Sequence, residues 1–73
     1  MYGKRIRELR EERGWTQTEL GKKLNCSTRT ISRYELEQHE ITAQVIIRFC
    51  HIFKVSADYI LGIEDETGAK TYR

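Results

Sequence analysis

Two arginines four residues apart stand out in the stretch TQTELGKKLNCSTRTISRYE, which covers residues 16–35. Arg29 and Arg33 would share one face of a helix, because residues at positions i and i+4 lie one above the other. Thr28 and Ser32 fall on the same face, so hydroxyl groups accompany the two guanidinium groups. Such a surface is suited to a negatively charged partner. The alternative is that both arginines are ordinary solvated helix side chains.

The chain offers little for catalysis or metal binding. No nucleophile is paired with a base, and there is no Gly-rich phosphate loop or carboxylate pair. The four potential zinc ligands Cys26, His39, Cys50 and His51 lack paired spacing, and adjacent Cys50 and His51 would point to different sides of a helix. We therefore predict no catalytic residue, no metal and no cofactor. Both cysteines are expected to be reduced thiols, although a single bridge is compatible with the sequence.

Basic residues are concentrated in the first half of the chain. Residues 1–33 carry nine Lys and Arg against four Glu, a net charge of +5, whereas residues 34–73 carry four against seven acids, a net charge of −3. This asymmetry favours a face for a polyanion, with a helix of mixed solvated charges as the alternative for KRIRELREER. At 73 residues the chain is expected to form one domain with a small core and no deep catalytic cavity.

The composition is that of a soluble globular protein, with 38% hydrophobic and 33% charged residues. No apolar run approaches the roughly 20 residues needed to span a bilayer. The charged start MYGKRIRELREERG is followed by no signal-peptide core. We therefore expect a cytoplasmic protein without membrane contact.

Apolar residues recur at helical spacing, which predicts five helices and no strand. The first helix should end at Gly14, since glycine closes helices in the left-handed conformation. The second should begin with a capping box of Thr16 and Glu19, with Trp15 filling the gap between the two helices. The predicted inward residues of this pair are Tyr2, Ile6, Leu9, Leu20 and Leu24.

A tight turn is predicted between the second and third helices. Asn25 tolerates the positive φ that such a turn needs, and Ser27 offers an oxygen to cap the next helix. Within that third helix Ile31 and Tyr34 should face the core. Two short helices joined in this way form a helix-turn-helix, whose second helix has a polar and basic outer surface.

The rest of the chain predicts a loop and two more helices. LEQHEI is expected to be the loop, Thr42 the cap of the fourth helix, Ser56 the cap of the fifth and Gly62 its end. The predicted inward residues are Ile46, Phe49, Cys50 and Phe53 in the fourth helix and Ala57, Ile60 and Leu61 in the fifth. We predict a domain over residues 1–63 and a short, polar, flexible tail over residues 64–73.

TQTELGKKLNCSTRTISRYE resembles the helix-turn-helix of the phage Cro and repressor type regulators, also called the Xre family. The resemblance runs over about residues 3–62, through IRELREERGWTQTELGKKL and VSADYILG. It implies a compact, all-α, five-helix, lambda-repressor-like DNA-binding domain. It also implies a sequence-specific regulator that binds double-stranded DNA, more a repressor than an activator, encoded by a bacterium or phage and associated with the nucleoid.

The resemblance also implies roles for individual residues. The helix from about Thr28 to Glu35 would lie in the major groove. Gln17 would touch the DNA backbone and support a neighbouring recognition side chain. The residues expected to face the bases are Ser27, Thr28, Arg29, Ser32 and Arg33. Those expected at the DNA backbone or in a supporting role are Thr16, Gln17, Lys22 and Lys23, with Arg5 and Arg10 as weaker candidates.

The chain departs from the family after the third helix. LEQHEIT replaces a glycine followed by basic residues, and Glu37 and Glu40 would repel phosphates there. An alternative function is therefore a protein-interaction module of the same fold, acting as an antagonist or co-regulator with little DNA binding. A positive strip joining Gln17, Arg29 and Arg33 favours DNA, whereas its interruption by Glu35 and the two loop acids favours a protein partner.

One module of this size makes few phosphate contacts, so useful specificity needs two copies on a two-fold symmetric operator. We expect a homodimer formed through the C-terminal region, with Phe53, Ile60, Ile63 and the exposed side of the fourth helix. Val45, Ile47 and Ile52 exceed what one inner helix face needs. The alternative is that these residues merely cover a small core.

Overall fold

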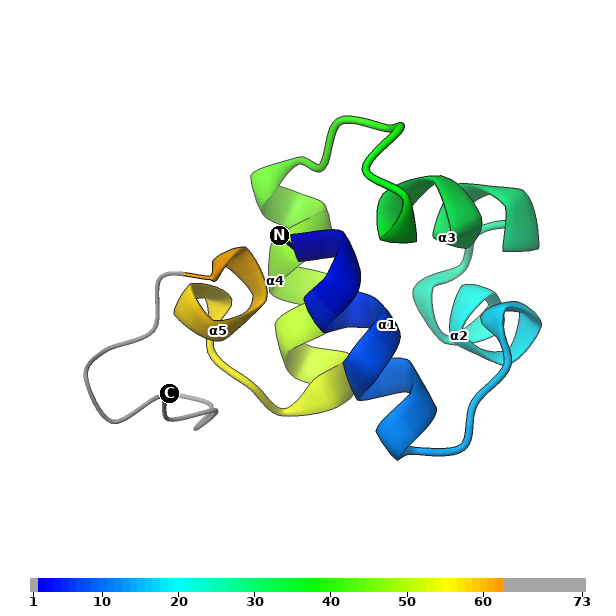
Figure 1. Ribbon diagram of the computed structural model, residues 1–73, viewed down its shortest axis with the longest axis horizontal. Helices are drawn as coiled ribbons and strands as arrows, with labels where there is room; N and C mark the ends of the chain where they lie inside the picture. Colours follow the sequence, from blue (N-terminus) through cyan, green and yellow to red (C-terminus); the bar gives the residue numbers. More distant parts are fainter. Residues whose placement is uncertain (1, 63–73) are drawn as a thin grey trace.

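Five helices and no strand are present in residues 2–62, the part of the chain that the computed structural model describes (Figure 1). They are α1 (Tyr2–Glu12), α2 (Gln17–Leu24), α3 (Thr28–Glu35), α4 (Ala43–Phe53) and α5 (Ala57–Leu61). The predicted all-α, five-helix fold is confirmed. Ile63 and the predicted tail, residues 64–73, lie outside the described residues.

The helix boundaries follow from the predicted capping residues. In the capping box of α2 the Glu19 amide donates to Thr16 Oγ1 at 3.0 Å, and the Thr16 amide donates to Glu19 Oε1 at 2.8 Å. Three further N-cap hydroxyls accept from the amide three residues on: Ser27 in α3, Thr42 in α4 and Ser56 in α5. Each cap satisfies an amide that the helix itself leaves unpaired.

All five helices contribute to one core. Figure 1 shows α1 and α4 in the middle, α2 and α3 on one side and α5 on the other. Phe49 and Phe53 of α4 are fully buried, and their rings stack with centroids 5.8 Å apart. Trp15 also stacks on Phe53 at 5.8 Å, so it packs against α4 in addition to closing the end of α1. The other fully buried residues are Ile6, Leu9, Leu20, Ile31 and Ile60.

Two expectations about the C-terminal helices are wrong. Phe53 and Ile60 are 0% exposed, so their side chains belong to the core and are not available as dimer contacts. Leu61, expected inward, is 37% exposed, while Tyr59 is buried and lies under the Arg5 guanidinium, 4.5 Å from its ring centroid. Successive residues of an α-helix point in different directions around its axis, so with Tyr59 and Ile60 facing the core the next residue, Leu61, is turned toward the outside.

α1 and α3 touch through their backbones. A Cβ atom at Gly3 would lie 2.3 Å from the carbonyl oxygen of Glu35, so only glycine fits there without a shift. Gly21 of α2 stands in the same relation to the turn, since its Cβ would lie 2.7 Å from the carbonyl oxygen of Cys26. The two glycines allow α1 and α2 to approach the segment that contains α3 more closely than side chains would permit.

We expect Gly3→Ala to destabilise the fold by about 1–3 kcal/mol, because the added methyl forces two backbones apart. Helix propensity alone would favour alanine by up to about 1 kcal/mol, so the direction of the change is informative. The measurement is urea unfolding followed by circular dichroism. Lys4→Ala, an exposed change in the same helix, is the control and should change stability by less than about 0.5 kcal/mol. A more stable Gly3→Ala variant would contradict the close approach.

The capping box should make α2 sensitive to acid. The backbone amide of Thr16, followed by its hydroxyl, lowers the pKa of Glu19 from its ordinary 4.5. Because the pKa is lower in the folded state, the ionised carboxylate stabilises the fold above pH 4.5, and this stabilisation is lost as pH falls through the lowered pKa. Glu19→Gln should therefore cost more stability at pH 7 than at pH 3 in urea titrations. An equal cost at both pH values would contradict this assignment.

Candidate nucleic-acid interface

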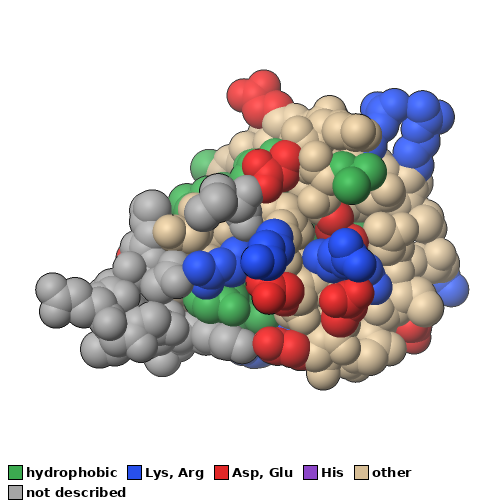
Figure 2. Space-filling model, in the orientation of Figure 1, with side chains coloured by type: hydrophobic (Ala, Val, Ile, Leu, Met, Phe, Trp, Pro, Cys, Tyr) green, Lys and Arg blue, Asp and Glu red, His purple; other side chains and the backbone are tan. Residues whose placement is uncertain are grey.

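The outer surface of α3 is polar, as its sequence pattern predicts. Ile31 is 0% and Tyr34 5% exposed, so these two residues anchor the helix in the core. Thr28, Arg29 and Arg33 are exposed on the opposite side, and Ser32 is half-buried at its edge. Figure 2 shows Lys and Arg side chains projecting at the upper right, over α3. A helix anchored on one face thus presents hydroxyl and guanidinium donors on the other.

The turn before α3 is held by backbone geometry. Asn25 has φ of 60°, the left-handed conformation predicted for it. The amide of Cys26 then donates to the carbonyl oxygen of Gly21 at 2.8 Å, which folds the turn back onto α2. Ser27, exposed and predicted to face bases, uses its Oγ to accept from the Thr30 amide at 3.1 Å. The turn therefore fixes where the first residue of α3 emerges.

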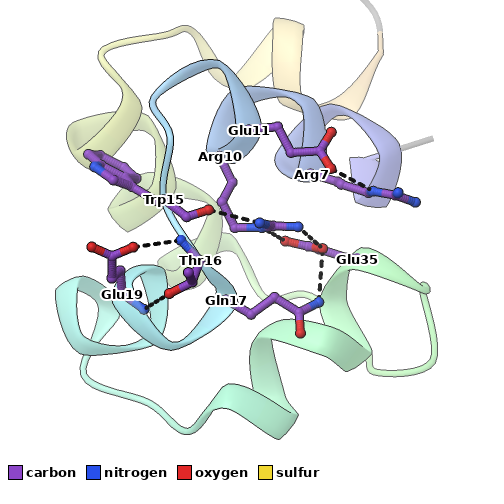
Figure 3. Close-up of polar contacts among 8 residues, drawn as sticks. All are labelled: Arg7, Arg10, Glu11, Trp15, Thr16, Gln17, Glu19 and Glu35. Atoms are coloured by element: carbon purple, nitrogen blue, oxygen red, sulfur yellow. Dashed lines mark hydrogen bonds and ion pairs between the residues drawn. The ribbon is translucent and has the colours of Figure 1, made fainter.

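An ion pair fixes the other end of α3 (Figure 3). Arg10 of α1 donates from Nε to Glu35 Oε2 at 2.7 Å and from Nη2 to Glu35 Oε1 at 3.2 Å. The two side chains are 12% and 4% exposed, so this bidentate pair is nearly dry. The hydrogen bond to Glu35 raises the pKa of Arg10 above its ordinary value, against the effect of burial.

Two further hydrogen bonds extend this pair to α2. Arg10 Nη1 donates to the carbonyl oxygen of Trp15 at 2.8 Å, just before the helix begins. Gln17 Nε2 donates to Glu35 Oε1 at 3.1 Å (Figure 3). We call Arg10, Glu35, Gln17 and the Trp15 carbonyl the junction network. It links α1, the start of α2 and the end of α3, so the three helices are oriented together.

The junction network changes two expectations from the sequence. Glu35 was expected to interrupt the positive strip, but its carboxylate is buried and paired, so it adds no open negative charge to the surface. Arg10 was a weaker candidate for a phosphate contact, but its guanidinium is bonded to Glu35 and to the Trp15 carbonyl and its side chain is nearly buried. Sequence reasoning missed this pair because the two residues are 25 positions apart and each lies in a run of charged residues.

Nothing in the sequence predicts a structural role for Thr18. Its Oγ1 lies 2.9 Å from Oγ1 of Thr28, across the gap between α2 and α3. Both are exposed, and nothing in their spacing marks them as partners. The resemblance implies that Gln17 supports a recognition side chain, and this role stays a prediction. In the structure the Gln17 amide donates to Glu35, at the far end of α3.

The candidates for the DNA backbone lie along α2. Thr16 is exposed and is engaged in the capping box. Lys22 and Lys23 are exposed, and Lys23 Nζ lies 4.5 Å from the centroid of the Trp15 ring. Gln17 and Ser32 share with Glu35 a depression of about 220 Å³ at the junction of the helices. The contacts of these residues with DNA stay predictions.

The acidic loop after α3 is attached to the start of α1. Glu37 takes a positive φ of 57°, and its Oε2 accepts from the Gly3 amide at 3.3 Å. The hydroxyl of Tyr2 donates to the carbonyl oxygen of His39 at 3.0 Å. Glu37 and Glu40 are nevertheless exposed, so repulsion of phosphates near this loop stays a prediction.

Within residues 2–62 no group of three or more His, Cys, Asp and Glu side chains is arranged to hold a metal ion. None of the helices in that range combines the length and apolarity of a membrane span.

Comparison with known proteins identifies the family to which the chain belongs. A sequence model of the family described as Helix-turn-helix matches residues 6–60. The chain is 35% identical over 68 residues to the HTH-type transcriptional regulator ImmR of Bacillus subtilis, covering 93% of this chain and 53% of that protein. It is 40% identical over 63 residues to the HTH-type transcriptional regulator PrpR of Mycobacterium tuberculosis, covering 86% and 13% respectively. The chain thus spans less than two thirds of each relative.

A solved structure has the same fold. The P22 c2 repressor protein, crystallised in complex with synthetic operator 9T, superposes with a TM-score of 0.80 at 28% identity. The match covers 88% of this chain and 97% of that one. The resemblance to phage repressors and the lambda-repressor-like fold are confirmed.

Breaking the junction network should be costly. Glu35→Gln leaves the buried Arg10 charge without its counter-ion, so we expect a loss of about 3 kcal/mol or more in urea unfolding. Arg7 and Glu11 form a matched control, an ion pair at 3.3 Å whose side chains are 63% and 52% exposed. Glu11→Gln should cost less than about 0.5 kcal/mol. Similar losses from the two substitutions would show that burial of the Arg10 pair has no special effect.

Proposed function

The chain belongs to the helix-turn-helix family whose model covers residues 6–60, and on that premise we propose that it is a sequence-specific, double-stranded DNA-binding transcriptional regulator that acts as a repressor. One observation carries this proposal. α3 exposes Thr28, Arg29 and Arg33 while both of its ends are tied to the rest of the domain. A rigidly held helix with donors on its outer face is what the major groove, about 12 Å wide, admits.

The mechanism we propose is occupancy of an operator. α3 lies in the major groove with Thr28 and Arg29 nearest the bases and Arg33 one turn further along. The planar fork of arginine can donate two bonds to O6 and N7 of guanine. The start of α2 would hold the DNA backbone through Thr16 and Gln17, with Lys22 and Lys23 as additional phosphate contacts. Binding alone blocks transcription in this scheme, so no catalytic step is needed.

Specificity in this scheme requires two copies of the chain. A two-fold symmetric operator would present half-sites about 34 Å apart, or multiples of that distance. We propose a homodimer that uses the exposed side of α4, where Ile47 is 53% exposed, together with the C-terminal region around Leu61. The protein would act in the cytoplasm of a bacterium, at the nucleoid, whether its gene is bacterial or of phage origin.

A second candidate function is a protein-interaction module of the same fold. Leu36 is 62% exposed directly after α3, and the exposed acids Glu37 and Glu40 follow it. An apolar residue beside acidic ones would suit a protein partner better than a phosphate backbone. The burial of Glu35 weakens this candidate, because one of the three acids said to interrupt the positive strip is neutralised.

Selection of bound duplexes from a random pool, followed by salt titration of the winner, tests the proposed function. Enrichment of a two-fold symmetric site, with affinity falling steeply as salt rises, would support the regulator. If no sequence is enriched and binding stays weak, the protein-interaction module becomes the better description of the isolated chain.

Arg29→Ala should cost about 1–3 kcal/mol of binding free energy and relax the preference at one base pair of each half-site. Lys4→Ala is the charge-matched control, since Lys4 lies beside Arg5 and Tyr59, on the α5 side of α1. It should leave sequence preference unchanged. Affinities of both variants are measured on the selected duplex and on its single-base-pair changes. An equal loss on every sequence would reassign Arg29 to a phosphate.

A further inference from the structure

Two threonine hydroxyls join the beginning of α2 to the beginning of α3. Thr18 Oγ1 and Thr28 Oγ1 are 2.9 Å apart, and either can be the donor. The contact lies at the opposite end of α3 from the bond between Gln17 and Glu35. α2 therefore contacts α3 by side-chain hydrogen bonds at both ends of the recognition helix.

This contact does little for the helices themselves. Thr16 caps α2 and Ser27 caps α3, so neither Thr18 nor Thr28 is needed as a cap. Both are in the first turn, where no carbonyl four residues earlier within the same helix can accept the hydroxyl proton. Both are also exposed, and water offers exposed hydroxyls similar bonds, so the gain in stability is small. The main effect of the contact is therefore to orient the side chains of Thr18 and Thr28.

We propose that Thr18 is a specificity-determining residue that acts by positioning Thr28 at the DNA. This inference rests on the proposed function, since Thr28 begins the helix assigned to the major groove. Thr28 Cβ carries two heavy atoms, Oγ1 and Cγ2, and a β-branched side chain has few χ1 rotamers. With Oγ1 bonded to Thr18, χ1 is fixed and the Cγ2 methyl is the group left to meet a base. The matching feature on DNA is the 5-methyl group of thymine.

The first part of the test needs no DNA. Three-bond couplings measured by NMR report χ1 of Thr28 in the free protein. We expect a single rotamer in the wild type and in Thr18→Ser, which keeps the hydroxyl, and rotamer averaging in Thr18→Val, which loses it. Thermal unfolding of each variant checks that the fold is retained. Identical couplings in wild type and Thr18→Val would overturn the positioning role.

The second part uses the selected duplex with each thymine replaced by deoxyuridine, which removes only the methyl group. We expect one thymine in each half-site whose methyl strengthens wild-type binding about three- to tenfold. Thr18→Val should lose most of this preference and Thr18→Ser should keep it. Thr30→Val is the control, since its hydroxyl bonds Ser27 within the same segment, and it should keep the preference as well.

The outcomes separate this inference from the proposed function. If the wild type enriches no duplex, the proposed function fails, and the reading of thymine fails with it. If the wild type enriches an operator while Thr18→Val keeps the same thymine preference, only the role of Thr18 fails. A loss by Thr18→Val that is equal on every sequence would make Thr18 a phosphate contact and would also overturn the inference.

Discussion

The ion pair between Arg10 and Glu35 is the interaction on which the arrangement of the first three helices depends. Both groups are almost removed from water, a transfer that costs several kcal/mol per ion unless hydrogen bonds compensate for it. Here the guanidinium makes two bonds to the carboxylate and one to the Trp15 carbonyl, and Gln17 supplies a further donor to the carboxylate. An apolar pair of similar volume could stabilise the core as well. It would not specify the distance and angle between α1 and α3, which a bidentate pair does.

The backbone contacts of the domain follow from that constraint. α1 can bring Arg10 to Glu35 only if its other end passes close to α3, and Gly3 permits this because it has no side chain. Gly21 has the same effect between α2 and the turn, so close backbone contacts lie at the end of α3 and in the turn just before its start. Its inner residues Ile31 and Tyr34 then complete the core. The outer face of α3 takes no part in core packing, and a domain this small can offer a binding surface only on such a face.

Much of the fold could be predicted because its signals are local. The capping hydroxyls of Thr16, Ser27, Thr42 and Ser56 act within three residues, and the positive φ of Asn25 reflects a property of that residue alone. The missed features all depend on distant partners. Glu35 looks like a surface acid until Arg10 is placed against it. Phe53 and Ile60 were correctly predicted to face inward, but their complete burial, which excludes them as dimer contacts, depends on how the other helices pack around them. The same limitation applies to the site: helical periodicity identifies the exposed face of α3, but it carries no information about which hydroxyl of α2 faces Thr28.

The positive charge of the first half of the chain overstates what is available to a polyanion. Arg10 is neutralised by Glu35, Arg7 is paired with Glu11, and Arg13 donates to the Leu9 and Phe53 carbonyls while facing Glu12 at 4.0 Å. Within the described residues neither Arg29 nor Arg33 forms an ion pair, so the charge that remains open lies on α3, together with the exposed Lys22 and Lys23 of α2. Because counterion release scales with the number of phosphates neutralised, a domain built in this way should have a modest non-specific affinity. Under the proposed function, discrimination among sequences would come from the few side chains at the start of α3 and from the bonds that orient them.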